Sequence, residues 1–196
     1  MFRYVSNAGL VFQVGAKKIG IDCLSRDSAN LYQNTPLEIR QKMELDVLIF
    51  THEHEDHFCA EYVKEAWKRN PKLQIYATKK VVEGLAQVDI PTSNRNGAIL
   101  EIDDMQIQFI ETLHEGGQYA NVQNLTLLIK VGDKCLVVSG DAMPCKELFE
   151  RICTWSVQID WLFAPFSYVG LCSARKLMKE HLEIKNIFVL HQPRRE

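Results

Sequence analysis

The stretch Thr51-His52-Glu53-His54-Glu55-Asp56-His57 decides how the rest of this 196-residue chain is interpreted. It directly follows residues 46–50, an apolar run with the length and β-branched content of a buried strand. Six positions at this strand end contain four possible metal ligands: His52, His54, Asp56 and His57. Imidazole and carboxylate groups are the ligands that zinc and related transition metals accept. A group this dense at one strand end indicates a metal site rather than a set of solvated histidines.

The composition is that of an ordinary soluble globular protein, and its length fits a single domain covering residues 1–196. Hydrophobic residues make up 46% and charged residues 24%, which is enough for a substantial core. The net charge of -2 provides no basic surface, so we expect a small-molecule substrate and no nucleic acid. No signal peptide and no apolar run of membrane-spanning length are visible. The oligomeric state is not predicted.

Cysteine usage favours a reducing compartment. The six cysteines form no Cys-x-x-Cys pair, and no secretion signal accompanies them. We therefore expect reduced thiols in a cytoplasmic protein, most of them small core residues. Cys59 lies just past the histidine cluster, although a core position is its simpler explanation.

The first half of the chain predicts an antiparallel meander followed by alternating strands and helices. Thr35 is a candidate helix N-cap, because Pro36 fits the first helical position and Glu38 completes a capping box. The alternation after residue 46 implies parallel pairing through crossover helices. Residues 24–34 and 89–97 look irregular, and Asn96-Gly97 is a turn signal. The expected strands are 2–5, 10–14, 18–23, 46–50 and 73–77, and the expected helices are 36–43, 60–69 and 79–86.

The second half repeats this order of elements. Gly132-Asp133 predicts a tight hairpin turn, and Ser173 is a candidate cap for the last helix. The expected strands are 99–102, 106–113, 125–131, 134–139, 161–164 and 187–190, and the expected helices are 143–153 and 173–181. Two halves of this kind are compatible with two similar sheets that pack face to face with helices outside.

Three further candidate ligands follow predicted strands: His114, Asp141 and His191. Reactive groups of open α/β sheets gather beyond the carboxyl ends of the strands. Of the six histidines, only His181 lies away from a strand end. Asp141 alone is equally compatible with an N-cap of the 143–153 helix, but the cluster favours a ligand for all three.

The complete pattern resembles the metallo-β-lactamase superfamily of hydrolases, through His-x-His-x-Asp-His after a strand and the three later ligands. The resemblance implies an α/β (α+β) fold, a four-layer αβ/βα sandwich of two mixed sheets with helices outside. It implies one metal held by His52, His54 and His114, and a second held by Asp56, His57 and His191. Asp141 is then the bridging ligand. By the same resemblance, Asp22 supports the histidine loop from the end of the 18–23 strand.

The implied chemistry is dinuclear hydrolysis, in which a metal-bridging hydroxide attacks a carbonyl or phosphoryl centre. Esters, lactones, thioesters and phosphodiesters are all compatible substrates. Asp56 and Asp141 are the candidate catalytic carboxylates, and Asp56 is placed to orient the nucleophile or relay a proton. Two Zn²⁺ ions are the first expectation, with Mn²⁺ or Fe²⁺ as alternatives. Tyr119 and Tyr168 are candidate substrate contacts, although an ordinary surface tyrosine is an equally good explanation for each.

Thr35-Pro36 and residues 46–52 also resemble the compact single-domain branch, which includes relatives of ascorbate-6-phosphate lactonase and N-acyl-phospholipid phosphodiesterases. Three other readings stay open. The first is a mononuclear iron oxidoreductase of the persulfide dioxygenase type, using only His52, His114 and Asp141. The second is a small nuclease, which the acidic balance disfavours. The third is a non-catalytic binding module on the same fold.

Overall fold

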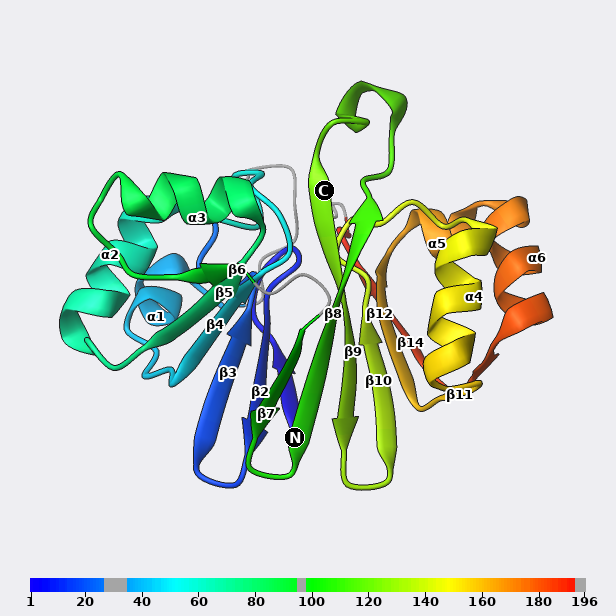
Figure 1. Cartoon of the computed structure of the whole chain (residues 1–196), viewed down its shortest axis with the longest axis horizontal. Coiled ribbons are helices and arrows are strands. Elements are labelled where there is room, and N and C mark those ends of the chain that lie inside the picture. Colours follow the sequence, from blue (N-terminus) through cyan, green and yellow to red (C-terminus); the bar gives the residue numbers. More distant parts are fainter. Residues whose placement is uncertain (27–34, 95–97, 193–196) are drawn as a thin grey trace. The chain divides into compact units, whose positions relative to one another are not determined.

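The computed structural model describes residues 1–26, 35–94 and 98–192. The chain divides into two compact units, Met1–Arg95 with His191–Glu196 (unit 1) and Asn96–Leu190 (unit 2). Each unit contains one six-stranded mixed sheet with its own helices (Figure 1). The expected pair of mixed sheets with helices is thus confirmed, whereas the single domain stays a prediction. The Asn96-Gly97 turn and most of the irregular 24–34 segment lie outside the described residues.

The sheet of unit 1 has the strand order β1-β2-β3-β4-β5-β6. β1, β2 and β3 pair antiparallel, as the meander predicted, and β3, β4, β5 and β6 pair parallel. Parallel pairing places the carboxyl ends of β3 and β4 at the same edge, so Asp22 and the Thr51–His57 stretch emerge together. The bounds are β1 Phe2–Tyr4, β2 Leu10–Val14, β3 Lys17–Ile21, β4 Val47–Phe50, β5 Gln74–Ala77 and β6 Ser93–Asn94.

The helices of unit 1 cover one face of its sheet (Figure 1). They are α1 (Leu37–Gln41), α2 (Ala60–Arg69) and α3 (Lys79–Ala86), and the last two have the predicted bounds. Val63 of α2 and Leu85 of α3 are fully buried in one core cluster with Leu48 and Phe50 of β4. This packing fixes the strand from which the histidine loop departs.

The expected cap at Thr35 is wrong. Pro36 occupies the N-cap position of α1, and no side chain caps the helix. Thr35 instead accepts hydrogen bonds through its hydroxyl, from the Arg3 guanidinium, and through its carbonyl, from Nε of the buried Arg40. Tertiary partners have therefore taken the groups that a local cap would use.

The sheet of unit 2 has the order β14-β12-β10-β9-β8-β7. β7, β8, β9 and β10 pair antiparallel, and β10, β12 and β14 pair parallel. Gly132, with a φ of 56°, makes the predicted turn between β9 and β10. The bounds are β7 Ile99–Ile102, β8 Met105–Leu113, β9 Gln123–Val131, β10 Lys134–Val138, β12 Trp161–Pro165 and β14 Ile187–Leu190, with a separate pair, β11 Gln158–Ile159 and β13 Glu183–Ile184.

The helices of unit 2 are α4 (Lys146–Trp155), α5 (Ser167–Gly170) and α6 (Cys172–His181), with a 3₁₀ turn η1 (Gly117–Tyr119). α4 begins later than expected, because the N–H of Met143 is bonded to the Leu113 carbonyl. Ser173 lies inside α6, whose N-cap is Leu171, so the expected Ser173 cap is wrong. Among the described residues, no helix is both long and apolar enough to span a membrane.

Candidate metal centre

Asp22 anchors the histidine loop of unit 1. Its carboxylate accepts hydrogen bonds from the Thr51 backbone N–H at 2.8 Å and from the Thr51 hydroxyl at 2.6 Å. The same carboxylate lies 2.8 Å from Nδ1 of His57. Asp22 is 1% exposed and adopts a left-handed φ of 47°, which turns its side chain towards the loop. Asp22 thus has the contacts of a residue that supports the loop.

These bonds assign the tautomers of two histidines. A carboxylate only accepts, so Nδ1 of His57 carries the proton and Nε2 presents its lone pair. Nδ1 of His52 lies 3.1 Å from the Thr51 hydroxyl, which already donates to Asp22 and so accepts from His52. Nε2 of His52 therefore also presents a lone pair. Histidines that bind metal through one ring nitrogen typically donate a hydrogen bond to a protein group from the other, as Nδ1 does here.

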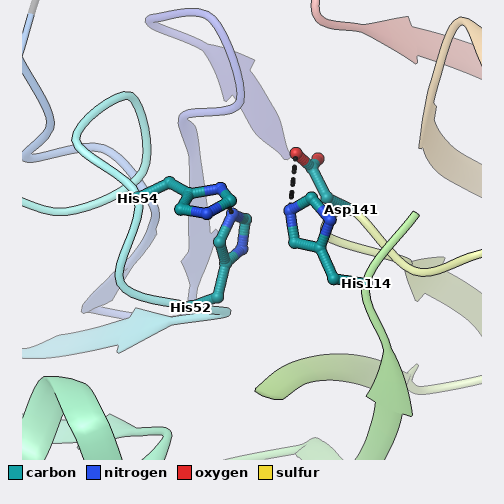
Figure 2. Close-up of side chains that lie close together, drawn as sticks. All are labelled: His52, His54, His114 and Asp141. Carbon is teal, nitrogen blue, oxygen red and sulfur yellow. Dashed lines mark hydrogen bonds and ion pairs between the residues drawn. The ribbon is translucent and has the colours of Figure 1, made fainter. Parts of the chain in front are cut away.

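His52 and His54 meet ring to ring in unit 1 (Figure 2). Nε2 of His52 lies 3.1 Å from Nδ1 of His54. The intervening Glu53 instead makes an ion pair with Lys80 of α3 at 3.0 Å, and Glu55 pairs with Arg26. The alternation of the loop thus separates its histidines from its glutamates.

Asp56, His57 and His191 form a compact group within unit 1. One ligand atom from each lies within 4.8 Å of the others. The Nε2 atoms of His57 and His191 are 3.0 Å apart, and Oδ2 of Asp56 lies 3.6 Å from Nδ1 of His191. His191 follows β14 and has a left-handed φ of 54°. Two adjacent donors and a third from 134 positions further along the chain therefore surround a space suited to one cation.

His114 and Asp141 form the corresponding group of unit 2, where they lie side by side (Figure 2). Nε2 of His114 is 3.5 Å from Oδ2 of Asp141. They follow β8 and β10, which run in the same direction on either side of β9 and so end at one edge. Nδ1 of His114 lies 2.6 Å from the Glu115 carbonyl, so it carries the proton and leaves the Nε2 lone pair towards Asp141.

Two buried asparagines, absent from the sequence predictions, hold candidate ligands in place. Oδ1 of Asn124 accepts the N–H of Asp141 at 3.0 Å, and its Nδ2 donates to the Ser139 carbonyl. Nδ2 of Asn7 donates to Asp56 at 2.8 Å and also lies 3.1 Å from Nδ1 of His191. Their only signal in the sequence is a polar residue beside an apolar strand.

The two candidate substrate tyrosines have different surroundings. Tyr119, in η1, is 38% exposed, and its ring meets His114 edge to face at 5.0 Å between centroids. Tyr168 is 0% exposed and packs edge to face on Phe149 in the core of unit 2. Burial raises the pKa of Tyr168. A residue so enclosed offers substrate no surface, so we assign Tyr168 no substrate contact.

The donor set fits a transition metal. It combines imidazole nitrogens and carboxylate oxygens, and the remote nitrogens of His52, His57 and His114 are bonded to protein groups. Cys59 adds no ligand, because its Sγ donates to Glu61 and burial raises the pKa of the thiol. The described residues thus contain a His/Asp cluster that is able to hold metal.

The sequence matches the model of one protein family, described as the beta-lactamase superfamily domain, over residues 2–183. Among curated proteins, no significant match to the chain is found. The family match covers most of both units.

Solved structures resemble the chain along almost its whole length. Igni18, a metallo hydrolase from Ignicoccus hospitalis, is 16% identical at a TM-score of 0.69, and the match covers 97% of this chain and 81% of that one. The metallo-β-lactamase fold protein YhfI from Bacillus subtilis is 16% identical at a TM-score of 0.69, and the match covers 97% of this chain and 80% of that one. CmlA, a diiron β-hydroxylase from Streptomyces venezuelae, is 13% identical at a TM-score of 0.65, and the match covers 96% of this chain and 44% of that one. These likenesses show the fold, and they confirm the predicted fold class.

Proposed function

Because the chain belongs to the β-lactamase superfamily, we propose that it is a dinuclear metal-dependent hydrolase of small-molecule substrates. His52, His54 and His114 would hold one divalent ion, and Asp56, His57 and His191 the other. Asp141 would be the ligand that bridges the two ions. This ligand assignment is the one that the family pattern implies.

One observation carries the proposal: the Asp56, His57 and His191 donors converge, with Nε2 of His57 selected by Asp22. This group is the second half of the ligand set, which a mononuclear site does not need. Its retention favours a dinuclear hydrolase over the mononuclear iron oxidoreductase that uses only His52, His114 and Asp141.

The carboxylates have separable roles. Oδ2 of Asp56 accepts the Asn7 amide at 2.8 Å, so the carboxylate is oriented and its second oxygen remains to accept a proton and pass it to a leaving group. Asp141 is 8% exposed and paired with His114, which suits a fixed ligand better than a mobile acid. Divalent ions held there would supply hydroxide at neutral pH and neutralise charge that develops on a substrate oxygen.

Zn²⁺ is our first choice of metal, since imidazole-rich sites with carboxylates suit it, and Mn²⁺ or Fe²⁺ are the alternatives. Tyr119 is the proposed substrate contact, because its exposed ring lies against His114. If its hydroxyl binds a substrate oxygen, Tyr119→Phe will raise KM and leave metal content unchanged. We also propose a cytoplasmic location, because all six cysteines are free thiols.

The test begins with metal quantification on the purified protein, followed by a panel of lactones, thioesters, phosphodiesters and β-lactams. We expect two ions per chain and turnover of at least one substrate class. His52→Ala and Asp141→Ala should each lower both metal content and turnover, whereas His181→Ala, in α6, should lower neither.

Full turnover by a metal-free His52→Ala/Asp141→Ala variant would refute the proposal. A single iron per chain would instead favour the oxidoreductase, and strong salt-dependent binding of nucleic acid would favour a nuclease.

A further inference from the structure

Asn7 contacts two of the proposed ligands without being a ligand itself. Its side chain is fully buried in the loop between β1 and β2. Nδ2 lies 2.8 Å from Oδ2 of Asp56 and 3.1 Å from Nδ1 of His191. These contacts bridge 49 and 184 positions of sequence, respectively. One amide group thus joins two ligands that lie far apart in the sequence.

The backbone of Asn7 adds a second hold on His191. The Asn7 carbonyl accepts the His191 N–H at 3.1 Å and the Tyr4 hydroxyl at 3.1 Å. The surrounding loop is closed by hydrogen bonds from Val5 N–H to the Gly9 carbonyl and from Gly9 N–H to the Ser6 carbonyl. The Asn7 side chain therefore extends from a fixed backbone, which is what a positioning residue requires.

We propose that Asn7 is a positioning residue for the metal held by Asp56, His57 and His191, an inference that rests on the proposed function. The side-chain Nδ2 of Asn7 orients Asp56 and also contacts the ring of His191. The ring is thereby fixed so that its Nε2 lies 3.0 Å from Nε2 of His57. Asp56 in turn fixes the amide in this orientation, because a half-turn would bring Oδ1 of Asn7 against the carboxylate, where neither group can donate.

Loss of the Asn7 side chain should weaken the binding of the ion held by Asp56, His57 and His191 (the second ion). It should leave the binding of the ion held by His52, His54 and His114 (the first ion) unchanged. Partners behind metal ligands typically contribute 10–100-fold to metal affinity. We therefore expect Asn7→Ala and the similarly sized, apolar Asn7→Leu to bind the second ion about 10–100-fold more weakly. The first ion should keep its wild-type affinity, because the Asn7 amide contacts Asp56 and His191, which are ligands of the second ion. His191→Ala, which removes a ligand, should lose the same ion.

The experiment measures Zn²⁺ stoichiometry and both dissociation constants by chelator competition, with no substrate present. Far-UV circular dichroism and the urea midpoint of each metal-free protein report on the fold. Ser6→Ala is the matched control, because Ser6 is equally buried in the same loop and its hydroxyl makes no hydrogen bond to the described residues. It should bind both ions as the wild type does.

Selective loss of the second ion in both Asn7 variants, with an unchanged metal-free fold, supports the inference. Second-ion affinity within twofold of wild type overturns it and leaves the proposed function intact. Equal weakening of both ions together with a lower urea midpoint also overturns it, because Asn7 would then act on the fold. A wild-type protein that binds no ion overturns the proposed function, and this inference with it.

Discussion

Removing the Asp22 carboxylate should damage the fold and the metal site in separable ways. The carboxylate accepts two hydrogen bonds from Thr51 and one from His57, all within 2.8 Å, in a fully buried position. Hydrogen bonds to a charged group contribute about 1.5–3 kcal/mol each, but relief of the desolvation of a buried carboxylate offsets part of the sum. We therefore expect Asp22→Ala to lower the free energy of unfolding by about 3–5 kcal/mol.

Asp22→Asn should separate the two effects. Asparagine tolerates the left-handed φ of 47°, and its Oδ1 can still accept the Thr51 N–H. Its amide nitrogen, however, faces Nδ1 of His57 with a donor, which favours the tautomer with the proton on Nε2. We expect a smaller loss of stability than in Asp22→Ala, but metal affinity lowered about 10–100-fold.

Urea denaturation of the metal-free variants and Zn²⁺ titration measure the two quantities. Asp103→Ala is the matched control, because Asp103 is an exposed residue with a φ of 51° and so reports the backbone cost alone. Wild-type metal affinity in Asp22→Asn would refute the tautomer argument. A stability loss in Asp22→Ala no larger than that of Asp103→Ala would refute the anchoring argument.

Three further predictions concern parts of the fold away from the ligands. Gly20→Ala should cost about 1–3 kcal/mol of unfolding free energy by urea titration, because its Cβ would lie 2.4 Å from Cys23 Sγ, and adding Cys23→Ala should restore part of it. In alkylation followed by mass spectrometry, the exposed Cys172 should react before Cys23, whose pKa burial raises to about 12. The hydrogen bond from the Lys185 ammonium lowers the pKa of Asp160. The ionised carboxylate therefore stabilises the fold at pH values above its usual pKa of 3.8, and this stabilisation is lost as the pH falls through the lowered pKa. Asp160→Asn should flatten the pH dependence of the urea midpoint in that acidic range.

Much of the scaffold was predictable because its signals are local. The bounds of α2 and α3 follow from amphipathic periodicity between clear strand and turn signals, and β14 is a short apolar run before His191. The seven proposed ligands were named for the same reason, since each follows a strand end. The caps at Thr35 and Ser173 failed because tertiary contacts and α5 set the helix starts. A propensity for capping states what a side chain is able to do, whereas its partners decide what it does.

The residues that the sequence did not reveal act over long separations. Asn7 reaches Asp56 and His191, and Asn124 reaches Asp141 across 17 positions from within β9. No periodicity or spacing encodes such pairings, because they depend on which strands become neighbours. Tyr168 is the converse case: a tyrosine after Pro165 suggests a surface loop, but α5 turns it into the core against Phe149.

Left-handed backbone at His191 and at Asp22 explains why such partners are needed. His191, at a φ of 54°, adopts a conformation that costs a residue with a Cβ about 1–2 kcal/mol, and Asp22 is in the same region. Gly140, at 55°, makes the equivalent turn before Asp141 without that cost. The hydrogen bonds of Asn7 and of Asp22 offset the strain at these two non-glycine positions and hold His191 and His57 in place. A metal that binds only the folded chain should therefore stabilise these same turns, and the gain should grow with the logarithm of the free metal concentration.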